Sequence, residues 1–233
     1  MNNIFFAPIS GFTKENTVEI IGQEALHISK VLRHNIGDSI LVADGEGARF
    51  EAEITELSKK SVEAKILTTN CEARPEKEKV MALGIIKKRD RLEFAIEKTV
   101  ELGASELCLF NADHSERTKL NKDRVQLHIV SAFKQSGRYW LPKLVVLNSL
   151  DEVLSHYSDS EFCMAHEEIE VSNQPKALTA EQTILLVGPE GGFSSREVAL
   201  NKEKGGSFVS LGKNRLRAET AVTAFLSQYL FSM

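Results

Sequence analysis

The chain has 233 residues, of which 42% are hydrophobic and 27% charged, and its formal net charge at pH 7 is −4. This composition is ordinary for a globular protein, and the length suits one large domain or two small ones. No apolar run approaches the roughly 20 residues of a membrane-spanning helix. Because the first residues also lack the pattern of a signal peptide, we expect a cytoplasmic protein.

The cysteines and histidines give no sign of a metal site. Cys71, Cys108 and Cys163 are odd in number and far apart, and no CxxC motif occurs. We therefore expect neither a disulfide framework nor a thiolate zinc site. The six histidines show no HExxH spacing, so we expect no metal cofactor. Cys108 and Cys163 lie in apolar runs, which favours buried, unreactive thiols.

The basic residues are unevenly distributed, although the chain as a whole is acidic. Seven basic and two acidic residues occur between Glu116 and Lys143, and further basic clusters occur at residues 87–91 and 213–217. A localised basic surface can bind phosphates even on an acidic protein. The alternative is that these runs are simply solvated surfaces.

The N-terminal part reads as short strands joined by turns. Residues 39–43, 49–54 and 61–67 alternate between apolar and polar side chains, and Asp44 to Gly47 is a turn signal between the first two. One helix is expected near residues 24–33. Short alternating strands of this kind predict a small β-barrel.

From Val80 onward, strands alternate with helices. Such alternation predicts an α/β fold, with a parallel sheet that carries helices on both faces. Asp90 with Glu93, and Ser194 with Glu197, have the spacing of a helix-capping box. The expected strands are 80–86, 106–110, 144–147, 162–165, 183–187 and 207–211, and the expected helices begin near Asp90, Lys122, Ser149, Ser194 and Ala218.

A glycine-rich loop, Gly188 to Gly192, follows the apolar strand that ends at Val187. It matches neither the GxxxxGK[ST] phosphate loop nor the dinucleotide GxGxxG motif. Glu190 would repel a phosphate, so the glycines suit close approach of the backbone to a neutral or cationic ligand, such as an adenosine-bearing sulfonium. The alternative is a tight turn that needs a glycine at positive φ.

A second, cationic loop runs from Leu211 to Arg217 and leads into the last helix. Both loops follow strands, so they should meet at the edge of the sheet where open α/β sheets bind ligands. Arg215 and Arg217 suit an anionic or planar partner. Glu219 can be explained as a first-turn acid favoured by the helix dipole. Gln135 to Arg138 are either ordinary residues of a helix end or phosphate contacts.

Taken together, these motifs resemble the RsmE family of bacterial small-subunit ribosomal RNA uracil-N3 methyltransferases, in the SPOUT superfamily. The resemblance covers nearly the whole chain, and the two C-terminal loops are its most specific part. Residues 212–217 differ slightly from the usual family loop, so the resemblance assigns Arg217 more directly than Arg215. The matching segments are residues 31–33 with 37–38, 101–103, 115–117, 135–138, 188–194, 211–212 and 216–221.

The resemblance implies a fold and partners that the pattern alone would not suggest. It implies a PUA-like barrel at residues 1–70, a linker at 71–79 and a SPOUT domain at 80–233 whose C-terminal segment forms a trefoil knot. S-adenosyl-L-methionine would sit in the knot, and the chain would form a homodimer that acts on 16S ribosomal RNA of the small subunit. Rival interpretations are a SPOUT enzyme with another RNA target and a non-catalytic RNA-binding or ribosome-assembly protein.

The resemblance also assigns site residues. Arg217 would stabilise the anion of the target base, and Glu219 is a candidate proton acceptor. Cofactor contacts are expected at Leu186, Gly188, Pro189, Glu190, Gly191, Gly192, Leu211, Gly212, Leu216 and Thr220. RNA contacts are expected at Arg33, Arg89, Arg117, Gln135, Arg138 and Arg215.

Overall fold

The computed structural model describes residues 3–13, 16–58, 60–116, 119–167 and 180–229. The chain divides into two compact units, Met1–Arg74 with Val130–Leu141 and Pro75–Ile129 with Pro142–Met233. Helix α3 (Lys122–Ser136) therefore contributes residues to both units. The chain returns to the first unit without any local signal in the sequence, and the domain limits 1–70, 71–79 and 80–233 stay a prediction. Within the described residues, no helix is long and apolar enough to cross a membrane.

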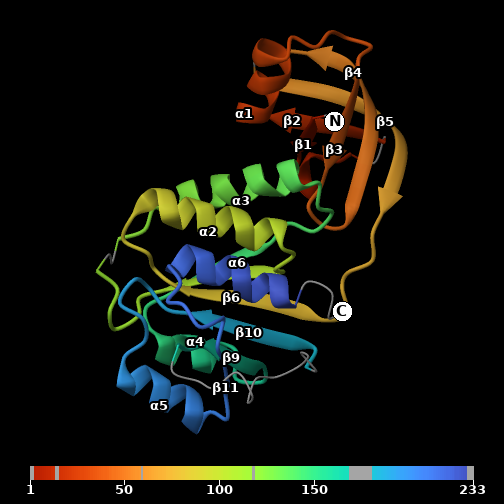
Figure 1. Cartoon of the computed structure of the whole chain (residues 1–233). Helices are drawn as coiled ribbons and strands as arrows, with labels where there is room; N and C mark the ends of the chain where they lie inside the picture. Colours follow the sequence, from red (N-terminus) through yellow and green to blue (C-terminus); the bar gives the residue numbers. More distant parts are fainter. Residues whose placement is uncertain (1–2, 14–15, 59, 117–118, 168–179, 230–233) are drawn as a thin grey trace. The chain divides into compact units, whose positions relative to one another are not determined.

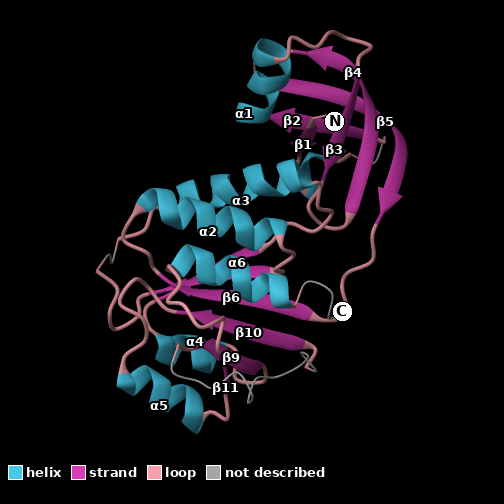
Figure 2. Ribbon diagram, in the orientation of Figure 1, coloured by secondary structure: helices cyan, strands magenta, loops and turns pink. Residues whose placement is uncertain are grey.

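The first unit holds a five-stranded sheet, in the order β1-β3-β4-β5-β2 (Figure 1). Strand β1 pairs with β3 in parallel, and the other neighbours are antiparallel. The register between β4 and β5 shifts at two places, and such bulges increase the local bend and twist of a sheet. The sheet is curled, as a half-barrel (Figure 2). The strands are β1 (Ile4–Phe6), β2 (Thr17–Ile21), β3 (Ser39–Ala43), β4 (Ala48–Leu57) and β5 (Ser61–Cys71).

Alternation along these strands directs one set of side chains to a common core. Val42, Ile54 and Val62 are fully buried there, together with Phe5 and Ile28. The helix expected near residues 24–33 is present as α1 (Gly22–Leu26), which continues into the π-helical turn η2 (His27–Val31). A short 3-10 turn, η1 (Ile9–Gly11), follows β1.

The second unit is built on a six-stranded sheet, in the order β11-β9-β10-β6-β7-β8. Every pair of neighbours in this sheet is parallel, which confirms the α/β class expected from the alternation of strands and helices. The strands are β6 (Glu78–Gly84), β7 (Glu106–Phe110), β8 (Lys143–Leu147), β9 (Glu161–Ala165), β10 (Gln182–Val187) and β11 (Ser207–Val209).

Helices cover both faces of this sheet. Helices α2 (Arg89–Glu101) and α6 (Ala218–Gln228) lie on one face, and α4 (Leu150–His156) and α5 (Ser195–Glu203) lie on the other (Figure 1). Because side chains alternate along a strand, one set from each strand packs against α4 and the opposite set turns toward α2 and α6. Leu186 belongs to the core on the α4 side, where it is fully buried.

Two expected caps differ in outcome. Ser194 and Glu197 form the complete capping box at the start of α5, as expected. The prediction that Asp90 caps α2 is wrong, because the helix begins one residue earlier. Lys88 is its N-cap residue, no side chain caps it, and Asp90 lies in the first turn.

The second unit buries one ammonium group and two thiols. The ammonium of Lys79 is buried and donates to the carbonyl oxygen of Tyr229 at 3.0 Å, which links β6 to the end of α6. Cys108 and Cys163 are buried in the sheet, as expected, and burial raises the pKa of their thiols to about 12 and about 11. Both thiols therefore stay protonated and unreactive at neutral pH.

Candidate active site

A cavity of about 680 Å³ lies at the edge of the parallel sheet where β9, β10 and β11 end. Its size falls within the roughly 300–1,000 Å³ of small-molecule sites. The loops after β10 and β11 supply most of its walls, so the two loops meet, as their positions after parallel strands predicted. Eight of the expected cofactor residues line it: Gly188, Pro189, Glu190, Gly191, Gly192, Leu211, Gly212 and Leu216.

The glycines of the first loop are required by close backbone packing. A Cβ on Gly188 would meet the carbonyl carbon of Gly192 at 3.0 Å, and a Cβ on Gly191 would meet Cβ of His114 at 2.8 Å. Gly192 has φ of +70° and donates to the carbonyl oxygen of Pro189 at 2.9 Å. The tight turn expected for these glycines is therefore present, and their close approach to a ligand stays a prediction.

The start of the loop is fixed to the end of strand β6. A Cβ on Gly84 would meet Cδ of Pro189 at 2.6 Å, so the proline packs on a bare stretch of backbone. Glu190 accepts the backbone N–H of Lys87 with both carboxylate oxygens, at 3.1 and 3.2 Å. Glu190 therefore joins the loops after β10 and β6, in addition to lining the cavity.

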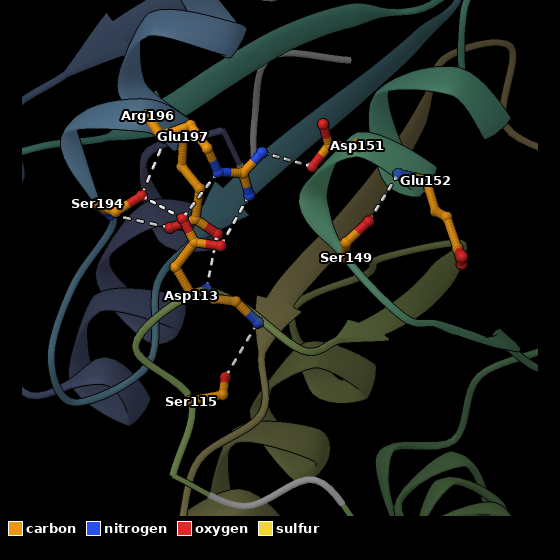
Figure 3. Close-up of polar contacts among 9 residues, drawn as sticks. Asp113, Ser115, Ser149, Asp151, Glu152, Ser194, Arg196 and Glu197 are labelled. Carbon is orange, nitrogen blue, oxygen red and sulfur yellow. Dashed lines mark hydrogen bonds and ion pairs between the residues drawn. The ribbon is translucent and has the colours of Figure 1, made fainter.

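The end of the loop is fixed by a polar network (Figure 3). Glu197 is fully buried and accepts the backbone N–H groups of Asp113 and Ser194, at 3.1 and 2.9 Å. Arg196 donates to both carboxylate oxygens of Asp113, at 3.0 and 2.7 Å, and to Asp151 of α4 at 2.9 Å. The Arg196 guanidinium holds the pKa of Asp113 below its ordinary value. These bonds pin the loop to the segment after β7 and to α4.

The second loop brings two arginines to the cavity. Arg217 is the N-cap residue of α6 and lines the cavity beside Leu216. Arg215 also lines it, but its side chain is 73% exposed and lies 3.7 Å from Glu167, measured from Nε to Oε2. Both arginines are therefore available to a ligand that enters from solvent.

Three of the expected catalytic and cofactor-binding residues do not line the cavity. Leu186 is in the core on the α4 side of the sheet, whereas its neighbour Val187 lines the cavity. Thr220 is exposed on α6. Glu219 is only 9% exposed, and its Oε1 lies 3.6 Å from Nε of Arg91, a cavity residue from α2. Their assigned roles as site residues remain predictions.

The expected RNA-binding residues fall in different environments. Arg89 contacts Oε1 of Glu93 at 2.8 Å, and Arg124 and His128 of α3 contact the same oxygen at 2.8 and 3.2 Å. A single carboxylate oxygen thus gathers three basic side chains at the start of α2. Arg33 is exposed at φ of +57°, and Gln135 is exposed. Burial lowers the pKa of Arg138 to about 10, and Arg117 lies outside the described residues.

Sequence reasoning missed two residues at this site. Arg91 belongs to the basic cluster at residues 87–91, in which the sequence predicts a role for Arg89 alone. Its position next to Leu92, on the buried side of α2, was the available signal. The imidazole Nδ1 of His114 lies 3.0 Å from the carbonyl oxygen of Gly191. No local pattern around His114 predicts that contact.

Comparison with known proteins agrees with this geometry. A family model described as an RNA methyltransferase domain matches residues 74–230, and one described as an RNA methyltransferase PUA domain matches residues 20–67. The ribosomal RNA small subunit methyltransferase E of Bacillus subtilis is 30% identical over 91% of this chain and 88% of its own length. The chain belongs to the RsmE family of RNA methyltransferases.

Other members of the RsmE family give the same picture. The protein of that name from Synechocystis is 31% identical, over 92% of this chain and 73% of its own. A crystal structure of the Neisseria gonorrhoeae ribosomal RNA small subunit methyltransferase E, bound to S-adenosyl methionine, has a TM-score of 0.84 and 25% identity. It covers 97% of this chain and 96% of its own, so the fold is shared along both units.

Proposed function

We propose that the chain transfers the methyl group of S-adenosylmethionine to N3 of a uridine in 16S ribosomal RNA of the small subunit. One observation carries the proposal: a glycine-walled cavity at the sheet edge that also receives arginines from a second loop. The names of the relatives, and the S-adenosyl methionine bound to the Neisseria structure, support both the reaction class and the cofactor.

The residues of the cavity fit S-adenosylmethionine. Gly188, Gly191 and Gly192 line the cavity and bring no side chain to it, which suits a close contact of the backbone with ribose or adenine. Leu211 and Leu216 offer apolar surface for the base. When bound, this cofactor supplies an electrophilic methyl group on a sulfonium. A cationic ligand also suits the carboxylate of Glu190 better than a phosphate would.

The target nitrogen needs help from the protein. Uracil N3 carries a proton at neutral pH and is then a poor nucleophile, so the reaction requires its imide anion. A guanidinium next to that anion stabilises it and lowers the pKa of the N3–H group. Arg217, held at the start of α6 on the cavity wall, is our candidate for this role. Further rate comes from holding the base in one orientation.

The RNA must reach the cavity with its target base unstacked. We propose that phosphates flanking this base contact the basic group around Glu93, formed by Arg89, Arg124 and His128. Arg215 lies at the cavity itself and would contact the RNA nearest the target. Arg33, Arg117, Gln135 and Arg138 remain candidates for contacts farther away.

Two further expectations belong to this proposal. We propose that the chain works as a homodimer, the assembly that its family resemblance implies, and sedimentation equilibrium at micromolar concentration tests this. We also place the protein in the cytoplasm, because its proposed substrate is assembled there. Cell fractionation followed by immunoblotting tests the location.

The decisive experiment offers labelled S-adenosylmethionine to small ribosomal subunits that lack their native methylations, followed by nucleoside analysis. We expect labelled 3-methyluridine. A different methylated nucleoside would contradict the uracil N3 assignment while leaving an RNA methyltransferase. If neither subunits nor naked RNA accepts a methyl group and S-adenosylhomocysteine does not bind, the enzymatic proposal fails in favour of a non-catalytic RNA-binding role.

A further inference from the structure

Arg91 and Glu219 form an ion pair that links the cavity to the packed interface of α2 and α6. Nε of Arg91 and Oε1 of Glu219 are 3.6 Å apart, and the two side chains are 23% and 11% exposed. Arg91 lines the cavity, whereas Glu219 does not. The pair therefore joins a guanidinium that lines the cavity to a carboxylate that does not.

Glu219 is held in an environment that suits a fixed carboxylate. It lies in the first turn of α6, where the positive end of the helix dipole favours a negative charge. Its Oε2 is buried and, among the described residues, has no hydrogen-bond partner. A buried carboxylate with one free oxygen is costly unless a cation compensates it. Arg91 is the cation that the structure places beside it.

This geometry does not favour Glu219 as the proton acceptor of the reaction. A general base must come within about 3 Å of the proton that it removes, directly or through one water. Arg91 lines the cavity, whereas Glu219 does not line it and is paired with Arg91 at 3.6 Å. The carboxylate can instead orient the guanidinium, which reduces the conformational entropy that Arg91 loses when it binds a ligand.

We propose that Arg91 is an oxyanion-binding residue of the cavity and that Glu219 is the positioning residue that aims it. The proposal deepens the proposed function and rests on it. The two oxyanions available to such a site are the carboxylate of the cofactor and a phosphate of the RNA substrate. Arginine binds either group through paired, charge-assisted hydrogen bonds.

The first test separates the two oxyanions by ligand binding. Calorimetry compares S-adenosylhomocysteine with methylthioadenosine, which lacks the amino-acid carboxylate, on the wild type and on Arg91→Met. If Arg91 binds the cofactor carboxylate, Arg91→Met weakens S-adenosylhomocysteine about tenfold or more and leaves methylthioadenosine unchanged. If Arg91 binds RNA phosphate, both ligands keep their affinity and the KM for RNA rises about tenfold. No change in either quantity would overturn the proposal.

The second test separates positioning from proton transfer. Glu219→Gln keeps an oxygen that can face Arg91 but removes the basic carboxylate, whereas Glu219→Ala removes both. We expect Glu219→Gln to retain kcat within about fivefold with an unchanged pH profile, and Glu219→Ala to match the binding defect of Arg91→Met. Loss of activity in Glu219→Gln that high pH restores would identify a base and contradict the positioning role.

Two controls separate a failure to fold from the loss of the Arg91 contact. Thermal unfolding shows whether the Glu219 variants fold, and Arg91→Lys, which keeps the charge but not the planar fork, tests the site if they do not. We expect Arg91→Lys to bind the oxyanion more weakly than the wild type; equal binding would contradict a forked contact. If the wild type transfers no methyl group to RNA, the proposed function fails separately, because the S-adenosylhomocysteine comparison does not need the reaction.

Discussion

The two loops that form the cavity differ in how they are held. The loop from Gly188 to Phe193 is fixed at both ends, by Glu190 on the Lys87 N–H group and by the network around Glu197. The loop that contains Arg215 and Arg217 is more exposed, and Arg215 lies 3.7 Å from its ion-pair partner Glu167. One loop provides a rigid backbone surface, and the other provides charge.

This difference suggests a division of labour. A rigid backbone surface recognises a small ligand at little entropic cost, because its groups are already in place. Exposed arginines pay that cost on binding but can follow a larger, flexible partner such as single-stranded RNA. We therefore expect substitutions of the first-loop glycines to affect the cofactor and substitutions of the second-loop arginines to affect the RNA and the reaction.

The largest expected effect is at Arg217. Arg217→Ala should lower kcat for methyl transfer by about 10³-fold, the order seen when one electrostatic stabiliser of a transition state is lost. S-adenosylhomocysteine affinity, measured by calorimetry, should stay within about threefold because our proposal assigns Arg217 to the target base and not to the cofactor. An equal loss of affinity would show that Arg217 shapes the cofactor pocket, and the two loops would then share one task.

The next largest effect should come from the first loop. Gly191→Val places a side chain where even a Cβ would be 2.8 Å from His114, so the loop must move out of position. We expect S-adenosylhomocysteine affinity to fall by about 100-fold, which corresponds to a loss of about 3 kcal/mol of binding free energy. Ala199→Val on the exposed surface of α5 is the matched control. Wild-type affinity in Gly191→Val would remove this loop from the site.

A moderate effect is expected from the network that holds the first loop. Asp113→Asn should destabilise the fold by about 1 kcal/mol at pH 7, because it weakens charge-assisted bonds to Arg196. The native pKa of Asp113 is lowered, so its stabilisation is present above the unfolded pKa of about 4 and is lost as pH falls through the native value. Denaturation at pH 7 and pH 3 should therefore show the difference between variant and wild type shrinking in acid. A constant difference would contradict the role of charge.

The smallest effect is expected at Arg215, whose side chain is 73% exposed. Arg215→Ala should raise the KM for RNA about threefold and leave cofactor affinity unchanged. A plot of the logarithm of the RNA association constant against the logarithm of the salt concentration should also become less steep. Its slope should fall by about 0.7, the value for one phosphate contact to a single strand. An unchanged salt slope would mean that Arg215 makes no phosphate contact.

The sequence predicted much of this architecture because most of its signals are local. The alternation of residues 39–43 and the apolar run of residues 106–110 match β3 and β7. Ser194 and Glu197 close their capping box within four residues. The sequence also predicted the glycine-rich loop, because its clustered glycines directly follow an apolar strand.

The parts that could not be predicted depend on contacts between distant residues. Glu197 was expected only as a cap, yet it also accepts the N–H group of Asp113, 84 residues away. Arg91 and Glu219 meet because α2 packs on α6, which no local pattern encodes. Asp90 has ideal cap spacing, but the helix began at Arg89 instead.

Helix α6 links the chemistry to a remote point of the unit. Its first residue follows Arg217, and beyond its last turn the carbonyl of Tyr229 is held by the ammonium of Lys79. Eleven residues of helix span about 16 Å, so one continuous helix joins these two points. A protein fused after the last residue would therefore act on the helix that begins next to Arg217, our proposed catalytic arginine. An affinity tag for kinetic work belongs at the other terminus.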